Sequence, residues 1–164
     1  MASTVSAGTL KVKIIEEIKL NGKDQGGVST FNIGSIDEVY KRIITCLANN
    51  ETRIVDFHSS VSDATLTPLD VQDVKYIRVT NLDDANSLTL SLQIDVGEDD
   101  TTADESASIL LGAGQSFIMG TPHDSVGVLD ANANLVTDLV DLESLVVQPG
   151  SNAIDIEILV ASAS

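Results

Sequence analysis

The stretch that decides the fold runs from Val74 to Val96 and reads VKYIRVTNLDDANSLTLSLQIDV. It holds two runs in which apolar and polar residues alternate, separated by a mostly polar cluster from Asn81 to Ser87. Period-two alternation is typical of strands with one buried face, and two such runs around a turn-forming segment predict a β-hairpin. We expect this hairpin to be the central scaffold, with a core made of Ile77, Val79, Leu88, Leu90, Leu92 and Ile94.

A second hairpin is predicted near the N-terminus. The stretch from Leu10 to Leu20 alternates, with charged groups dominating one face, as in a half-exposed antiparallel strand. Asn21-Gly22 follows and favours a type I′ turn, because both residues tolerate positive φ. Residues 28–33 can then return as the partner strand. The small polar residues 1–9 predict a flexible N-terminal arm, and residues 10–164 a single β-sandwich domain.

Residues 35–47 support two interpretations. Ser35 and Glu38 have the spacing of a capping box, and the apolar residues that follow fit a helical stripe. Residues 42–47 are instead rich in strand formers. We expect a short helical turn over 35–40 and then a strand, followed by a hairpin loop at 48–51 and another strand at 52–58.

Short strands and loops alternate over the rest of the chain. Further strands are expected at 107–111, 116–119 and 154–160, and a helical turn before a strand within 135–147. The long loop at 120–134 is a candidate contact element because of its length. The total is about eight strands with at most one or two short helical turns. This pattern predicts an all-β fold, an antiparallel β-sandwich or jelly roll.

Composition narrows the classes of partner. Of 164 residues, 43% are hydrophobic but only 3% are aromatic, so the core is aliphatic and stacking platforms for sugars or single-stranded nucleic acids are scarce. No apolar run approaches 18 residues, and the N-terminus lacks the pattern of a secretory signal. The single Cys46 rules out an intrachain disulfide, and its apolar neighbours predict a buried side chain.

The net charge of −16 is unevenly distributed along the chain. Residues 1–50 carry six basic and five acidic groups, residues 51–164 carry three and twenty, and Arg78 is the last basic residue. An acidic surface repels phosphate backbones, so we expect no nucleic-acid partner, and we expect no membrane partner either. The charge fits a solvated surface, or alternatively an acidic outward face with the more basic N-terminal third turned towards a partner.

No catalytic, cofactor-binding or metal-ligating residues are predicted, and the chain is not expected to be an enzyme. Ser59 follows His58, and Asp124 follows His123, but neighbours in sequence do not make a triad, and no GxSxG motif occurs. The acidic loop at 97–106 offers oxygen ligands for Ca²⁺, yet its spacing does not match an EF-hand. A solvated loop is the preferred interpretation, and no cofactor is expected.

Two short motifs stand out, YIRVTNLDD from Tyr76 to Asp84 and LGAGQSF from Leu111 to Phe117. With them the sequence resembles virion structural proteins of tailed phages, in particular of phages that infect marine cyanobacteria. The stretch LKVKIIEEIKLNGKD from Leu10 to Asp24 and the terminal strand from Ile154 to Val160 are also similar. The resemblance touches most of the chain, but it describes a fold more than a role.

The resemblance implies a non-enzymatic virion component, most simply an outer-capsid decoration (cement) protein that stabilises the shell. Its partners would be the major capsid protein or other virion proteins, and it would act as a homo-oligomer or in many copies. The alternatives are a tail, head–tail or fibre-attachment component, and a binding module for a host-surface glycan or a Ca²⁺-dependent adhesin. An enzyme is a third, disfavoured alternative.

Overall fold

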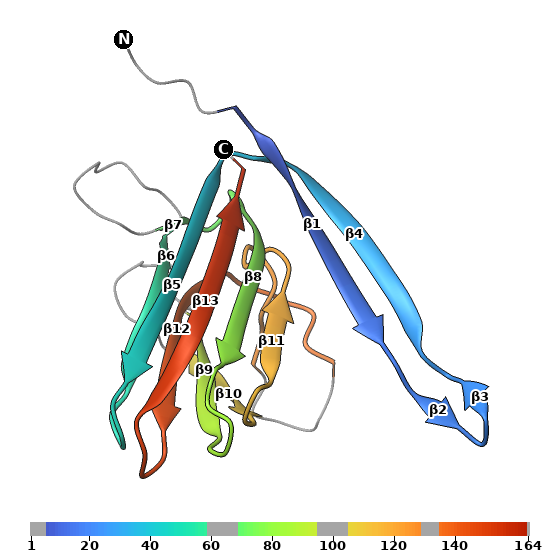
Figure 1. Cartoon of the computed structure of the whole chain (residues 1–164). Helices are drawn as coiled ribbons and strands as arrows, with labels where there is room; N and C mark the ends of the chain where they lie inside the picture. Colours follow the sequence, from blue (N-terminus) through green and yellow to red (C-terminus); the bar gives the residue numbers. More distant parts are fainter. Residues whose placement is uncertain (1–5, 59–68, 95–104, 129–134, 164) are drawn as a thin grey trace.

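The computed structural model describes residues 6–58, 69–94, 105–128 and 135–163, and no helix occurs among them. The predicted all-β class is confirmed (Figure 1). No segment of these ranges is a helix long and apolar enough to span a membrane. The strands are β1 (Gly8–Glu16), β2 (Lys19–Leu20), β3 (Lys23–Asp24), β4 (Gly27–Ile36), β5 (Glu38–Cys46), β6 (Thr52–His58), β7 (Leu69–Asp70), β8 (Val74–Asn81), β9 (Leu88–Ile94), β10 (Glu105–Leu111), β11 (Ser116–Met119), β12 (Leu142–Pro149) and β13 (Ile154–Ser162).

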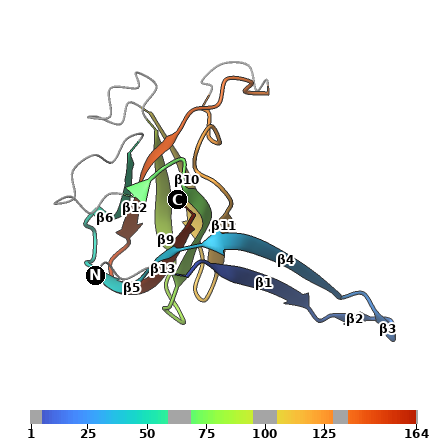
Figure 2. The same ribbon diagram turned by 90° about the horizontal axis from the view of Figure 1, so that it is seen from above.

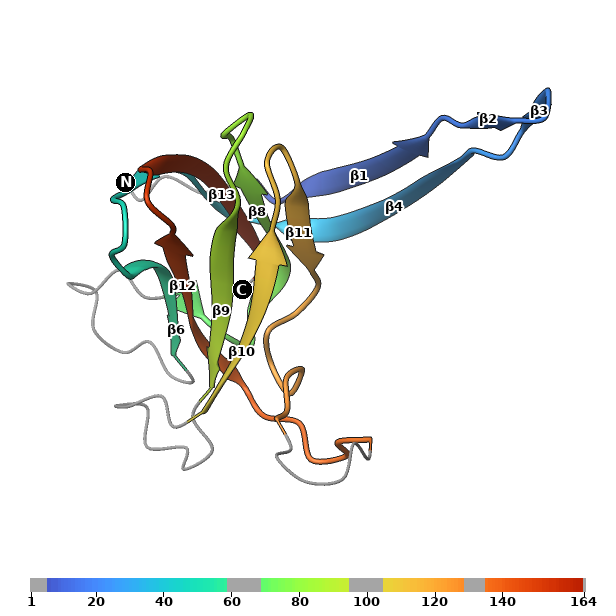
Figure 3. The ribbon, with the colours of Figure 1, turned by 90° about the horizontal axis from the view of Figure 1, so that it is seen from below.

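Two stacked sheets form the body of the molecule. One has the order β11-β8-β13-β5 and the other the order β10-β9-β12-β6-β7. Apart from the parallel β6–β7 contact, the pairs in both sheets are antiparallel. The two orders place eight of the strands opposite a chain neighbour, so that β5 faces β6, β8 faces β9, β11 faces β10 and β13 faces β12 (Figures 1 and 3). This is the strand order of a jelly roll.

The predicted central hairpin is wrong in its pairing, although both of its strands exist. β8 pairs with β11 and β13, whereas β9 pairs with β10 and β12, so the two strands lie in different sheets. Residues 82–87 therefore cross from one sheet to the other. Stacked sheets lie about 10 Å apart, which six residues span easily. Alternation of apolar and polar residues marks which face of a strand is buried. That pattern is the same whether two successive strands pair in a hairpin or lie in different sheets.

Three further local predictions are corrected. Residues 35–40 form no helical turn: β4 continues to Ile36, and β5 pairs with β13 from Glu38 to Cys46. That continuous ladder of main-chain hydrogen bonds outweighs the local capping signal. The loop at 48–51 joins β5 to β6 and so crosses between sheets instead of closing a hairpin. No helical turn precedes β12 in residues 135–141 either.

Four short connections cross between the sheets at one end of the molecule (Figure 1). These crossing loops, residues 47–51, 82–87, 112–115 and 150–153, are hydrogen-bonded to one another. The Asn49 N–H donates to the Gly150 carbonyl at 2.9 Å, and the Gly114 N–H donates to the Asp83 carbonyl at 2.9 Å. Asn152 Nδ2 lies 3.1 Å from Asn86 Oδ1, which links the third pair of loops. The loops thus form one continuous rim.

The core lies between the two sheets and is aliphatic, as the composition predicts. All six side chains expected from the central stretch are buried in it. Phe57 is the one aromatic side chain among the fully buried residues of the described chain. Cys46 is also buried, as predicted. The core continues through β12 and β13, whose inward residues include Leu142, Leu145, Val147, Ile154, Ile156, Ile158 and Val160.

The predicted N-terminal hairpin is confirmed, and it projects from the body (Figures 1 and 2). We call residues 8–36, from β1 to β4, the projecting hairpin. Its tip turns at Asn21 and Gly22, which have φ values of 50° and 76°, as a type I′ turn requires. Residues 1–5 of the predicted N-terminal arm lie outside the described residues, while Gly8 and Thr9 belong to β1.

Candidate functional site

The projecting hairpin packs against the described part of the body at its base. In its register Leu10 opposes Ile33 and Val12 opposes Phe31, so these four side chains share one face. Leu10, Val12 and Ile33 pack against a small cluster made by Ile36, Tyr76, Ala161 and their neighbours on the outer face of the four-stranded sheet. The ring of Phe31 lies beside that of Tyr76, with centroids 6.4 Å apart. Burial raises the pKa of the Tyr76 hydroxyl above its ordinary value of 10.0, partly offset by the Arg78 charge.

The outer part of the projecting hairpin is uncovered and apolar. Leu20 is 61% exposed and Val28 is 63% exposed. Ile14, Ile15 and Ile18 are exposed as well. A two-stranded hairpin is marginally stable at best in water, and contiguous exposed apolar side chains mark interaction surfaces. This element therefore has the properties of a docking segment.

The same element carries a small net positive charge within an acidic chain. The projecting hairpin carries four lysines against Glu16, Glu17 and Asp24, a net charge of +1. Residues 37–164 carry five basic against twenty-two acidic groups, a net charge of −17. The N-terminal third, which the sequence shows to be less acidic than the rest, thus contains the projecting hairpin. An acidic protein surface attracts such a hairpin.

A second uncovered apolar surface lies on β5. This strand is an edge of the four-stranded sheet, with β13 on its other side. Ile43 is 64% exposed, and Val39 and Leu47 are exposed beside it. The sheet surface next to them is charged: Glu157 on β13 forms ion pairs with Lys41, at 3.1 Å, and with Arg78. Edge strands with apolar side chains are surfaces on which another chain can dock.

An acidic hollow adjoins this edge at the rim of crossing loops. It is lined by Thr45, Leu82, Asp83, Asp84, Ala153 and Asp155. Asp155 accepts a hydrogen bond from the Thr45 hydroxyl at 2.6 Å. Asp83 accepts from the Ala85 and Asn86 N–H groups at 2.8 and 2.6 Å, and these bonds hold the pKa of its carboxyl below the ordinary 3.8. Each carboxylate has about four acceptor positions, so both can also accept from a cation.

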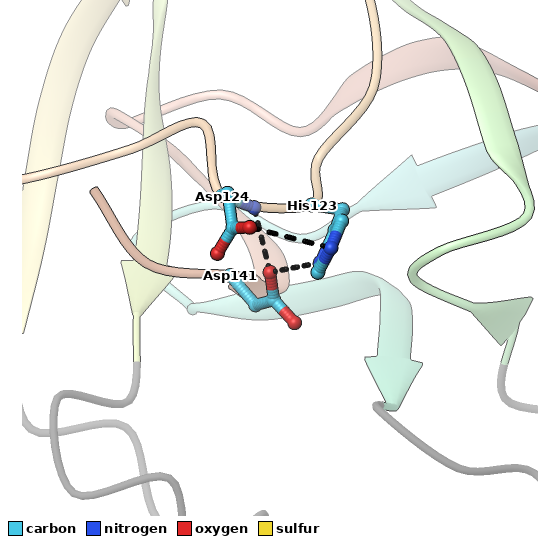
Figure 4. A group of neighbouring side chains, drawn as sticks. All are labelled: His123, Asp124 and Asp141. Atoms are coloured by element: carbon cyan, nitrogen blue, oxygen red, sulfur yellow. Dashed lines mark hydrogen bonds and ion pairs between the residues drawn. The ribbon is translucent and has the colours of Figure 1, made fainter.

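A cluster of His123, Asp124 and Asp141 lies away from these surfaces, between the loop after β11 and the start of β12 (Figure 4). His123 Nδ1 lies 2.7 Å from Asp141 Oδ1, and His123 Nε2 lies 3.3 Å from Asp124 Oδ2. The Asp124 N–H donates to the same Asp141 oxygen at 2.7 Å. Asp124 adopts a positive φ of 46°, which aspartate tolerates better than most residues.

The histidine cluster ties two loop segments together. One ring nitrogen of His123 contacts Asp141 and the other faces Asp124, so both nitrogens have a carboxylate neighbour. Val126 and Val140 exchange main-chain hydrogen bonds beside the cluster, at 2.8 and 3.2 Å. Sequence analysis paired His123 only with Asp124 and missed Asp141, which is eighteen residues further along the chain. The three side chains can also supply N and O ligands to a divalent cation.

The remaining residues considered for catalysis or Ca²⁺ binding lie partly inside the described ranges. His58 ends β6 beside Asp70 of β7, whereas Ser59 lies outside the described residues. Most of the acidic loop 97–106 also lies outside the described residues. Its interpretation as a solvated loop that binds no Ca²⁺ therefore stays a prediction. Glu105 and Ser106 belong to β10. In the long loop 120–134, the described residues 120–128 carry His123 and Asp124 of the histidine cluster.

Comparison with known proteins adds little. No family model matches the sequence, and no curated protein matches it. One similar solved structure is a chain of the Bacillus endospore appendages, which form a novel family of disulfide-linked pili. The two are 12% identical, the likeness covers 77% of this chain and 88% of that chain, and the TM-score is 0.38. A likeness this weak carries no conclusion about the present chain.

Proposed function

We propose that this chain is a non-enzymatic structural protein of a tailed-phage particle, and that it decorates the outer capsid and stabilises the shell. The resemblance of residues 76–84 and 111–117 to virion proteins supports the class. A role in assembly is supported by the projecting hairpin, because its base is buried while its apolar outer part is uncovered. A jelly roll is used by viral capsid proteins among many others, so the fold is compatible with the role without implying it.

The proposed mechanism is burial of surface across subunit junctions. The exposed isoleucines, Leu20 and Val28 would be covered when the decoration protein binds the major capsid protein. At about 25 cal/mol per Å² of apolar surface, a contact of a few hundred Å² supplies several kcal/mol before the entropic cost of association. Ligands that bind only the assembled state raise its stability by mass action. The acidic body, with its net charge of −17, would face water.

The deciding experiment counts the protein in purified particles and maps its position. Quantitative mass spectrometry against the major capsid protein should give many copies per particle, and cryo-electron microscopy should place them on the outside of the shell. A few copies at the portal or tail would support the tail or head–tail alternative instead. Absence of the protein from particles would contradict both.

A binding assay supplies the second test. Capsids that lack the protein should take up added purified chain until their sites are saturated, and should then resist heat better. The variant Ile15→Glu with Val28→Glu, which charges a directly paired position of the projecting hairpin, should bind poorly. Leu110→Glu, at a side chain that is 72% exposed on β10, is the matched control and should bind normally. Equal binding by both variants would exclude the hairpin as the contact.

A further inference from the structure

The uncovered part of the projecting hairpin and the uncovered edge of β5 point away from each other. In Figures 1 and 2 the hairpin leaves on the side opposite to β5, so its tip does not reach the β5 edge of its own molecule. In Figure 1 the tip and the crossing loops nevertheless lie towards the same end. One molecule therefore presents both surfaces without being able to pair them, while a second copy placed beside it can.

The chemistry of the two surfaces is complementary. At the tip, β2 and β3 pair Leu20 with Lys23 and Lys19 with Asp24. The receiving surface offers apolar Ile43, Leu47 and Leu82, all exposed, beside the acidic hollow. The hollow contributes Asp83, Asp84 and Asp155. The face of the tip that carries Leu20 contributes Lys23, while Lys19 and Asp24 pair on the opposite face. Apolar side chains on both sides, with opposite charges next to them, are the pattern of a specific docking contact.

We propose that the tip of the projecting hairpin of one copy docks on the β5 edge and acidic hollow of a second copy. The contact is heterologous, because the two surfaces that meet are different. Leu20 and Ile18 cover Ile43 and Leu82, and Lys23, the cross-strand partner of Leu20 on the same face, approaches Asp84 and Asp155. The proposal concerns the chain alone, so it stands or falls separately from binding to a capsid.

Two double variants make the test asymmetric. The tip variant, Leu20→Glu with Lys23→Glu, removes the docking element but keeps the receiving surface. The receiver variant, Ile43→Lys with Asp84→Lys, does the reverse. All four positions are exposed, so both variants should keep the fold, which circular dichroism and the melting temperature check. Leu110→Glu is the control for adding an acidic group at an exposed apolar site on another face.

Sedimentation velocity on the purified full chain gives the result. Wild type and Leu110→Glu should associate as concentration rises, and about 0.5 M salt should weaken this several-fold because it screens the charges. Each double variant alone should remain monomeric. Mixed together they should form a complex, since the tip of the receiver variant still fits the receiving surface of the tip variant.

Three outcomes would overturn the proposal. The first is a wild type that stays monomeric at every accessible concentration. The second is a receiver variant that still associates by itself, because hairpins would then be pairing with hairpins. The third is a mixture of the two double variants that remains monomeric although the wild type associates, because another surface would then be holding the copies together.

Discussion

The ring of Phe31 on β4 lies against the ring of Tyr76 on β8, with centroids 6.4 Å apart and planes inclined at 52°. This contact joins the projecting hairpin to the outer face of the four-stranded sheet. Beyond it the hairpin is uncovered, and before it the hairpin shares the small cluster around Ile36 and Ala161. The pair therefore marks where the projecting hairpin leaves the body.

Phe31→Ala should loosen the base of the hairpin without unfolding the sandwich. An aromatic pair contributes about 1 kcal/mol beyond burial of its area. Tyr76 should become more accessible, so that its raised pKa returns towards 10.0. The measurement is an ultraviolet titration of the phenolate in a Tyr40→Phe background, which leaves Tyr76 as the one tyrosine. Val28→Ala, beyond the contact, is the control and should leave the titration unchanged.

The raised pKa of Tyr76 also sets the direction in which stability changes with pH. The folded state holds the Tyr76 proton more tightly than the unfolded chain does, because burial disfavours the phenolate. Its stabilising contribution is therefore complete below pH 10 and is lost as the pH rises through the folded-state pKa. A Tyr76→Phe variant should lose less stability over that range than the wild type. An identical decline in both would contradict the assignment.

Asn81→Ala should lower the free energy of unfolding by about 1–3 kcal/mol, the cost of leaving buried polar groups without partners. The Asn81 side chain is fully buried, and its Nδ2 donates to the Asn86 and Gly112 carbonyls at 2.9 and 3.0 Å. It thereby connects two crossing loops. Asn152→Ala, which breaks an exposed bond in the same rim, should cost no more than about 0.5 kcal/mol. Urea denaturation of both variants compares them, and equal losses would refute a special role for Asn81.

Asp83→Asn should destabilise the chain at neutral pH and less so in acid. The Ala85 and Asn86 N–H groups lower the pKa of the Asp83 carboxyl, so its contribution is present above pH 3.8 and is lost as the pH falls through the folded-state pKa. The difference in stability between wild type and variant should shrink over that interval. Asp84→Asn, one residue along the same loop, is the matched control. A difference that does not depend on pH would show that the carboxylate charge is not the cause.

Cys46 should resist thiol reagents in the native protein. Its side chain is fully buried at the end of β5, and burial raises the thiol pKa above 9.0, with the Asp155 charge acting in the same direction. The reactive thiolate is therefore scarce at neutral pH. Labelling with a chromogenic disulfide should proceed only as fast as the chain opens, and should become rapid in denaturant. Because this is the single cysteine, the signal belongs to it, and immediate labelling of the folded protein would contradict the burial.

The sequence alone determined the all-β class, most strand positions and the core. Alternation with period two records which side of a strand meets other side chains, and this holds whatever strand lies beside it. The pattern therefore identified Ile77, Leu90 and Ile94 as core residues. The Asn21-Gly22 turn was equally predictable, because positive φ at two successive positions is a local requirement. Composition likewise fixed the aliphatic core and the uneven charge.

Only the tertiary structure decided how these parts are arranged. Alternation is identical for a hairpin and for a crossing between sheets, so the separation of β8 from β9 was not written in the local pattern. The contact between His123 and Asp141 joins residues eighteen positions apart, beyond the reach of any local motif. Ile14 and Ile77 look alike in the sequence, but one is exposed on the projecting hairpin and the other is buried. The reason is physical: burial depends on whether a second surface arrives to cover a side chain, and that surface comes from elsewhere in the chain.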